Sequence, residues 1–108
     1  MPTLESIDAA LAPLKLKHAV GMFTGSPAAD HYVLVPDYER GFEADNDDLF
    51  VDEYVNIEFH LGGDYRAKVA SAKSLLKAAG IGVLESRYVE YEKDAQKHHT
   101  TLAVFGRV

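Results

Sequence analysis

Cysteine is absent from this chain of 108 residues. A chain without cysteine has no disulfide framework, no thiolate nucleophile and no zinc–thiolate site. Redox chemistry therefore places no constraint on its compartment, although a cysteine-free chain is well suited to a cytoplasm.

Basic residues are also scarce, since 11 Lys and Arg stand against 17 Asp and Glu, giving a formal net charge of −6. Binding to phosphate groups needs concentrated Lys and Arg. We therefore expect no specific nucleic-acid binding.

Long apolar runs are missing too. No stretch approaches the roughly 20 apolar residues that a membrane helix requires, and residues 1–5 lack the basic and apolar regions of a conventional secretory signal. We expect a soluble, intracellular protein without a membrane partner.

The composition that remains is that of an ordinary globular domain, with 47% hydrophobic and 26% charged residues. A chain of this length can bury one hydrophobic core but not two. We therefore expect residues 1–108 to form a single domain.

The clearest pattern runs from residue 53 to residue 92. An alternating strand, with Val55, Ile57, Phe59 and Leu61 on one side, is followed by Gly62-Gly63. Asp64 is placed to cap a helix over 64–79, whose apolar stripe recurs at steps of three and four, and Gly80 is expected to be left-handed at its end. A strand over 81–92 follows.

The rest of the chain predicts shorter elements on either side. They are a helix from Thr3 that Pro13 ends, a strand over 14–23, a turn over 24–30, a strand over 31–38, an irregular stretch over 40–48, a turn over 93–97 and a strand over 100–108. The order α-β-β-β-α-β-β favours an α+β domain with a mostly antiparallel sheet packed against helices. The third strand, the helix and the fourth strand are expected to form one right-handed crossover and a single parallel pair.

The strand over 31–38 is apolar on both sides, which predicts burial on both faces or a face that another subunit covers. Its contact residues would be Tyr32, Val33, Leu34 and Val35.

Two oppositely charged segments complete the predicted contact surface. The segment 37–53 carries eight acids against a single base, and a long charged connection of this kind is typically functional or mobile. We expect 40–48 to be mobile in a free subunit and ordered on assembly. The contact residues would be Glu43, Asp45, Asp47 and Asp48 on one side and Arg66, Lys68, Lys73 and Lys77 of the helix on the other. The alternative for the four bases is a solvated helix face.

The sequence predicts no catalytic, cofactor-binding or metal-binding residues. An EF-hand over Asp45-Asn46-Asp47 lacks its glycine, because Phe50 stands at the sixth position. His98 and His99, with His60 elsewhere in the chain, are candidates for a metal or acid/base cluster. The adjacent pair points to opposite faces of a strand, however, so the two cannot chelate one ion together, and their role stays open. His60 and Asp64 have no serine nucleophile beside them.

Three tyrosines, Tyr54, Tyr88 and Tyr91, resemble a stacking platform for bases, but their strands are net acidic. Such a sheet face suits a protein interface better than RNA.

The order of features resembles that of the tail terminator or tail-to-head joining proteins of long-tailed phages and prophages. The resemblance covers about residues 31–105. It is carried by Ala44-Asp45-Asn46, the strand Val55 to His60, Gly63-Asp64-Tyr65, Lys73-Ser74-Leu75-Leu76, Ala79-Gly80-Ile81 and Tyr88 to Glu92.

The resemblance implies an α+β structural protein that is not an enzyme and has no cofactor. Such proteins form a homo-oligomeric ring, usually hexameric, that terminates the tail and joins it to the head connector. The implied partners are further copies of the chain and the phage tail-tube and head-connector proteins, and the implied location is the virion, or the host cytoplasm during assembly.

Two other functions stay open. One is a small ligand-binding or regulatory α+β domain, with Tyr54 and His60 in the wall of a pocket. The other is an enzyme that uses His60 and Asp64.

Overall fold

The structure is a computed structural model that describes residues 3–21, 29–44, 47–93 and 96–107. Within 37–52, and at Thr3 and Arg107, it describes the backbone but not the side chains. The elements are helix α1 (Thr3–Leu11), a 3-10 turn η1 (Ala12–Leu14), strands β1 (Lys17–Val20), β2 (His31–Ala44) and β3 (Asp47–Leu61), helix α2 (Tyr65–Ala78), and strands β4 (Gly82–Glu92) and β5 (Lys97–Arg107).

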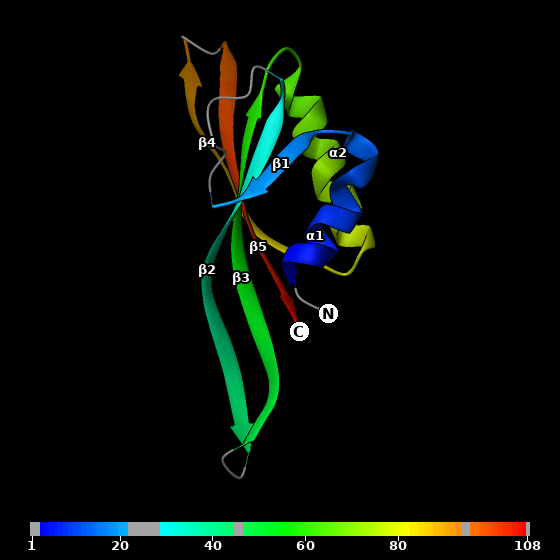
Figure 1. The fold of residues 1–108 in the computed structure, drawn as a ribbon, viewed down its shortest axis with the longest axis vertical. Helices are drawn as coiled ribbons and strands as arrows, with labels where there is room; N and C mark the ends of the chain where they lie inside the picture. The colour runs from blue at the N-terminus through cyan, green and yellow to red at the C-terminus, as the bar shows by residue number, and fades with distance from the viewer. Residues whose placement is uncertain (1–2, 22–28, 45–46, 94–95, 108) are drawn as a thin grey trace.

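The described strands form one five-stranded mixed sheet in the order β1-β2-β3-β5-β4. Helices α1 and α2 both lie on one face of this sheet (Figure 1), and no described helix covers the other face. The domain is therefore α+β with two layers, as the sequence predicted, and most of its strand pairs are antiparallel.

The single parallel pair lies elsewhere than expected. Strand β1 pairs in parallel with β2, with Lys17 opposite His31, whereas β5 lies between β3 and β4. The crossover through α2 therefore joins β3 to β4 across one intervening strand, and that strand is β5, the hairpin partner of β4. The predicted β3–β4 pair is wrong because β5 lies between these strands and pairs with β4 on one side and with β3 from Asp52 to Leu61 on the other.

The core lies between the helices and the face of the sheet beneath them. The buried side chains of the sheet alternate with the strand period and meet apolar stripes of both helices. They are Tyr32, Leu34, Val55, Ile57, Phe59, Leu61, Leu102 and Val104 from the strands and Ile7, Leu11, Val69, Ala72 and Leu76 from the helices.

The ends of α2 form as the sequence predicted. The Asp64 carboxylate accepts a hydrogen bond from the Ala67 amide at 3.3 Å, and Gly80 takes a φ of 81° after the helix. Of its predicted stripe, Val69, Ala72 and Leu76 are buried, Tyr65 is half-buried and Ala79 is exposed.

The first strand is shorter than its apolar pattern predicted. Residue Leu14 belongs to the 3-10 turn, and Lys15 and Gly21 have positive φ angles of 54° and 82°. A strand cannot continue through left-handed residues, so β1 is confined to Lys17–Val20. Of the predicted turn over 24–30, residues 24–28 lie outside the described residues.

The acidic stretch 40–48 is mostly strand, and the expectation of an irregular connection there is wrong. Strand β2 runs to Ala44 and β3 begins at Asp47, with Arg40 opposite Asp52. Residues 45–46 lie outside the described residues. Because Asp and Glu are poor strand formers, the composition indicated a loop, whereas the backbone pairing of a hairpin decides the structure.

The far end of this hairpin is a two-stranded ribbon that projects from the body (Figure 1). Strand β3 pairs with β5 only from Asp52 onward, so 47–51 pair with β2 alone. The molecule is elongated as a result, with extents of 53 × 27 × 21 Å.

Candidate functional site

The predicted contact strand 31–38 divides between the two faces of the sheet. Tyr32 and Leu34 are buried in the core of their own subunit, and the Tyr32 hydroxyl donates a hydrogen bond to Asp8 of α1 at 2.9 Å. Burial and this bond raise the pKa of Tyr32. Tyr32 and Leu34 are therefore corrected from contact residues to core residues, because the two helices cover their face. Val33 is half-buried and Val35 is exposed, and by register both belong to the helix-free face.

The predicted acidic contact residues belong to the ribbon. Glu43, Asp47 and Asp48 are in its paired strands, with Glu43 opposite Asp48. Asp45 lies outside the described residues. The backbone thus carries these acids away from the body of the molecule (Figure 1).

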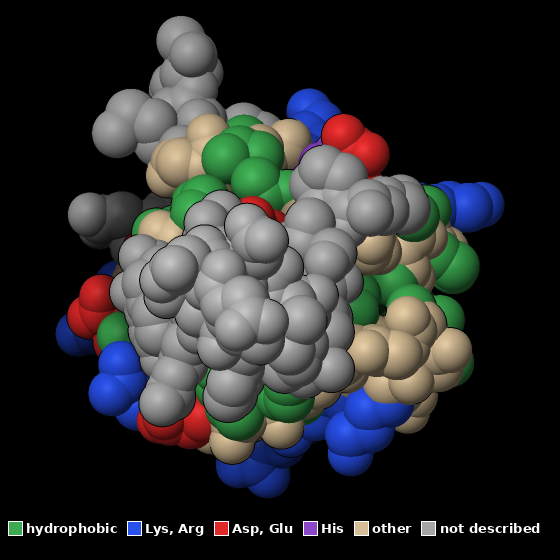
Figure 2. Space-filling model, turned by 90° about the horizontal axis from the view of Figure 1, so that it is seen from below, with side chains coloured by type: hydrophobic (Ala, Val, Ile, Leu, Met, Phe, Trp, Pro, Cys, Tyr) green, Lys and Arg blue, Asp and Glu red, His purple; other side chains and the backbone are tan. Residues whose placement is uncertain are grey.

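The predicted basic residues of α2 have different surroundings. Lys68 is engaged within its own subunit, where its ammonium group binds Asp30 and the Gly62 carbonyl. Arg66 and Lys77 are exposed, and Lys73 is half-buried. From below, Lys and Arg side chains appear at several places on the outline of the body, with hydrophobic patches between them (Figure 2). Lys68 is thus the least suited of the four to a contact between subunits.

Strand β4 carries exposed apolar side chains, of which the sequence predicted only Tyr88 and Tyr91 as interface residues. It is an edge strand, and Leu84, Tyr88, Val89 and Tyr91 are 58%, 45%, 43% and 46% exposed. Its pairing with β5 shifts register near Leu84 and near Val89, which marks a β-bulge at each place. The available signal was that apolar residues of 81–92 lie on both parities, as in 31–38.

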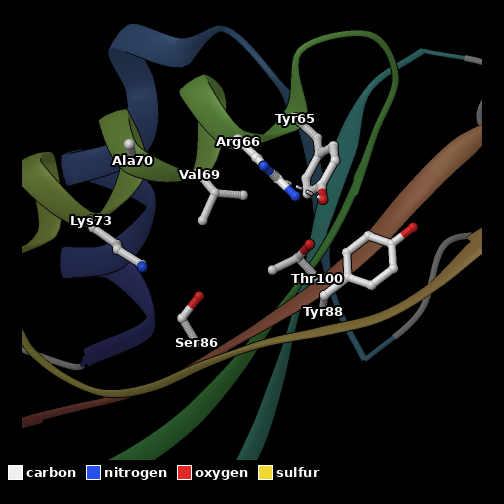
Figure 3. Close-up of a pocket in the computed structure, with 8 residues that line it drawn as sticks. All are labelled: Tyr65, Arg66, Val69, Ala70, Lys73, Ser86, Tyr88 and Thr100. Atoms are coloured by element: carbon white, nitrogen blue, oxygen red, sulfur yellow. Dashed lines mark hydrogen bonds between the residues drawn. The ribbon is translucent and has the colours of Figure 1, made fainter.

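A groove of about 360 Å³ runs between α2 and β4. Figure 3 shows Tyr65, Arg66 and Lys73 of α2 on one wall, with Ser86 and Tyr88 of β4 and Thr100 of β5 opposite. The Thr100 hydroxyl is buried and has no hydrogen-bond partner among the described residues. Two cations and an unpaired hydroxyl, in a groove that Ser86 and two tyrosines also line, suit a small anionic or polar ligand.

The tyrosines do not form one platform. Tyr54 stacks on Phe105, with ring centroids 5.9 Å apart, on the helix-free face. Tyr88 and Tyr91 instead pack around His98, whose ring stacks on Tyr65 of α2 at 4.2 Å. The hypothesis of a shared stacking platform is therefore wrong, because the sheet separates these side chains.

On the helix-free face, three imidazoles lie in a row across β2, β3 and β5. The ring of His60 stacks on His31 at 4.7 Å and on His99 at 4.4 Å between centroids. Glu92 of β4 lies 2.6 Å from His60 Nδ1. Burial lowers the pKa of His31, and the nearby His60 lowers it further. His98 is on the opposite side, as adjacent strand residues must be. The sequence-based prediction rejected a cluster of His60 with His98 and His99 because adjacent residues point apart, and it missed that register places His31, His60 and His99 side by side.

The His60–Asp64 pair considered for an enzyme is not present. His60 bonds to Glu92 instead, and the Asp64 carboxylate caps α2. The predicted pocket wall of Tyr54 and His60 is not part of the groove between α2 and β4. It is also not part of a smaller groove among the described residues of β3, β4 and β5, which Asn56, Glu58, Glu85, Arg87, Thr101 and Ala103 line.

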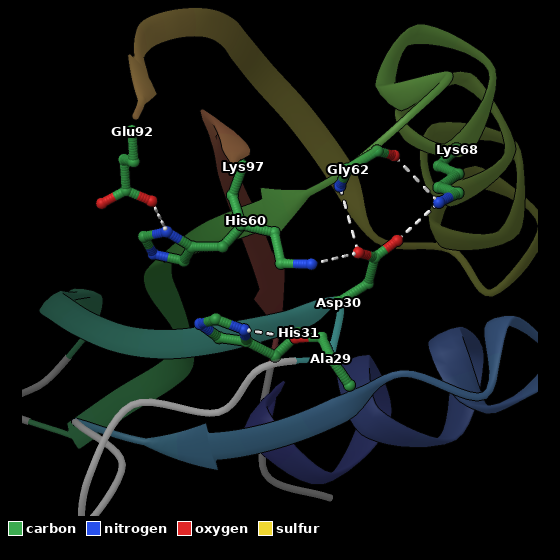
Figure 4. A network of polar contacts seen from close by, with 8 residues as sticks. All are labelled: Ala29, Asp30, His31, His60, Gly62, Lys68, Glu92 and Lys97. Atoms are coloured by element: carbon green, nitrogen blue, oxygen red, sulfur yellow. Dashed lines mark hydrogen bonds and ion pairs between the residues drawn. The ribbon is translucent and has the colours of Figure 1, made fainter. Parts of the chain in front are cut away.

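Asp30 joins three parts of the chain beside this row (Figure 4). Its carboxylate accepts hydrogen bonds from the Gly62 amide and from Lys97, each at 3.0 Å, and from Lys68. Burial by itself would raise the pKa of Asp30, but the three hydrogen bonds outweigh it and lower the pKa to about 2. The contact ties the start of β2 to the β3–α2 turn and to β5.

Neither described helix is long and apolar enough to cross a membrane. A comparison with protein-family models found no match, and neither did a comparison with curated proteins.

Proposed function

We propose that this chain is a structural subunit of a phage or prophage tail, which assembles with copies of itself into a ring that terminates the tail and joins it to the head connector. By the same proposal the ring is hexameric, the protein is not an enzyme, and it acts in the virion after assembly in the host cytoplasm. The order of sequence features from 31 to 105 supports the tail family, and the surface of β4 supports self-association.

The exposed edge of β4 carries the self-association part of the proposal. An edge strand of eleven residues offers unpaired backbone groups. Four of its large apolar side chains are also exposed, which favours a contact with a partner. Natural edge strands that stay unpaired usually carry charged residues, proline or β-bulges. Strand β4 has two bulges and four charged residues, but neither lysine nor proline.

The ribbon and the charge pattern favour a second copy as the partner. A two-stranded ribbon without further packing is only marginally stable in water, so contact with a neighbour would stabilise it. Its sequence is acidic, whereas α2 carries Arg66, Lys73 and Lys77. When one patch meets a different patch on the next copy, the contact is heterologous, as a closed ring requires.

Light scattering on the purified chain tests this proposal. We expect several subunits at micromolar concentration and rings in negative-stain images. A Leu84→Lys, Val89→Lys variant should be monomeric and folded, because lysine on an exposed edge opposes strand and apolar contacts. Ala9→Lys, Ala12→Lys, at exposed positions of α1 and η1, adds two lysines away from both proposed contacts and should assemble normally. A wild-type chain that stays monomeric would overturn constitutive assembly.

A second candidate function is that of a ligand-binding domain, which the groove between α2 and β4 favours. Arg66, Lys73 and the unpaired Thr100 hydroxyl converge on it (Figure 3). This function would be favoured over the ring if the chain is monomeric and binds a small anionic metabolite. An Arg66→Ala, Lys73→Ala variant should then lose that binding.

A further inference from the structure

The row of histidines on the helix-free face has the composition of a metal site. Strand register brings His60 of β3 opposite His99 of β5, and Glu92 of β4 reaches them from the adjacent edge strand. The candidate ligand atoms of these three side chains all lie within 4.8 Å of one another. Two imidazoles and one carboxylate are a ligand set typical of transition metals, and calcium and magnesium instead prefer oxygen ligands.

We propose that His60, His99 and Glu92 bind one divalent transition-metal ion of the zinc class. This site is independent of the proposed ring, because all three ligands come from one subunit.

The spacing of the ligands fits an ion after small side-chain movements. Zinc lies about 2.0–2.2 Å from nitrogen and oxygen ligands, so ligand atoms of a tetrahedral site are about 3.4 Å apart. The Glu92 oxygen and His60 Nδ1, which are 2.6 Å apart, need to separate by about 0.8 Å, and a pair at the 4.8 Å limit needs to approach by about 1.4 Å. Glu92, which is one-third exposed, can move by rotation about its side-chain bonds. The rings of His60 and His99 are stacked at an interplanar angle of 19°, so they must also turn until the ion lies in the plane of both.

The imidazole of His99 gives a second, independent indication. Its Nε2 is buried without a hydrogen-bond partner among the described residues, which is costly for a polar atom. The nearest carboxylate, that of Glu58, lies 3.4 Å away and is itself held by the Thr101 hydroxyl at 2.6 Å. When a ligating histidine binds an ion through one nitrogen, its other N–H usually donates to such a carboxylate. Glu58 is placed to receive that bond, in which case His99 would bind the ion through Nδ1.

The surroundings also hold the ligands in place and neutralise the nearest cation. His31 packs flat against His60, and its own Nδ1 lies 3.0 Å from the Ala29 carbonyl. The ammonium group of Lys97 is turned to Asp30 (Figure 4), so its charge is paired rather than directed at the ion. The fourth position of the ion would face the helix-free side, open to water or to a ligand.

Titration of the untagged, chelator-stripped chain with Co²⁺ and Zn²⁺ tests the proposal. We expect one equivalent to bind, with the visible absorption of four-coordinate cobalt and a rise in melting temperature as metal is added. His99→Ala and Glu92→Gln should each weaken binding by about tenfold or more. His98→Ala is the matched control, since it removes the neighbouring histidine on the opposite face, and it should bind as the wild type does.

Two results would overturn the proposal. One is a wild-type chain without stoichiometric binding. The other is a loss in His98→Ala as large as that in His99→Ala, which would indicate general surface binding. Circular dichroism checks that each variant is folded, and Glu92→Gln, which keeps the shape of a partly exposed side chain, answers the question if His99→Ala does not fold.

Discussion

At the scale of single residues, Asp30 links charge to stability. Its pKa of about 2 in the folded chain lies below the value of about 3.9 expected in the unfolded chain. A carboxylate with a lowered folded pKa contributes stability that is fully present above its unfolded pKa. This contribution is therefore lost as the pH falls from about 4 toward 2.

We predict that Asp30→Asn lowers the free energy of unfolding by about 1–2 kcal/mol at pH 7, an amount reduced for the partial exposure of the site. The variant should also lose less stability than the wild type between pH 4 and pH 2. Urea unfolding at a series of pH values measures both effects. Asp64→Asn is the control, because asparagine also caps helices well. An equal loss of unfolding free energy between pH 4 and pH 2 in Asp30→Asn and in the wild type would contradict the prediction.

Gly82 shows how closely the backbone of β4 approaches a neighbouring ring. A Cβ atom placed there would lie 2.2 Å from Cε1 of Phe105, far inside contact distance, and Phe105 is the cross-strand partner of Gly82. The ring is stacked on Tyr54, which restricts its retreat.

We predict that Gly82→Ala destabilises the fold by about 1–3 kcal/mol, because the added methyl group displaces the ring. The same substitution in a Phe105→Ala background should cost less, since the obstructing ring is gone. Chemical unfolding of the four chains gives this double-mutant cycle. Equal costs in both backgrounds would mean that the backbone, and not the ring, opposes a side chain at Gly82.

At the scale of elements, the β2–β3 hairpin has two parts with different support. Near the body β3 pairs on both sides, with β2 and with β5, whereas 47–51 pair only with β2. Backbone hydrogen bonds that lack packing open more readily than those of a core strand.

We therefore predict faster hydrogen exchange for amides of 41–44 and 47–51 than for those of 55–61 in the free subunit. Assembly should slow exchange in the ribbon and leave the core strands unchanged. Mass spectrometry of exchanged peptides measures both states. Protection of the ribbon equal to that of 55–61 in the free subunit would show that the ribbon is stable without a neighbour.

At the scale of the whole molecule, charge separates the acidic ribbon from the basic residues of α2. Exposed ion pairs are each worth only about 0–1 kcal/mol, so apolar burial must supply most of the affinity between subunits. Charge complementarity acts more on the rate of encounter. Salt should consequently slow assembly more than it weakens the finished ring.

We predict that Lys73→Glu, Lys77→Glu impairs assembly while the subunit stays folded, and that Lys at Asp47 and Asp48 restores it. The control, Lys15→Glu, Lys93→Glu, changes the net charge equally at exposed positions away from α2 and should assemble as the wild type does. Light scattering at low salt measures the outcome. Normal assembly of the Lys73→Glu, Lys77→Glu variant would show that the basic residues of α2 are only a solvated helix surface.

The sequence alone determined the features that depend on local periodicity and local sterics. The strand over 55–61, the helix after Asp64 and the left-handed Gly80 follow from alternation, a capping side chain and a missing Cβ, all within a few residues of one another. The α+β class followed from the order of these elements.

Tertiary structure decided what depends on contacts between distant segments. Tyr32 and Leu34 are core residues and not contact residues because helices lie over their face, which strand alternation alone does not show. The acidic stretch became a ribbon because backbone pairing outweighed weak strand propensity. The pairing of His60 with His99 has the same origin, since strand order and register bring together residues 39 positions apart in the printed sequence, and no local spacing encodes that register.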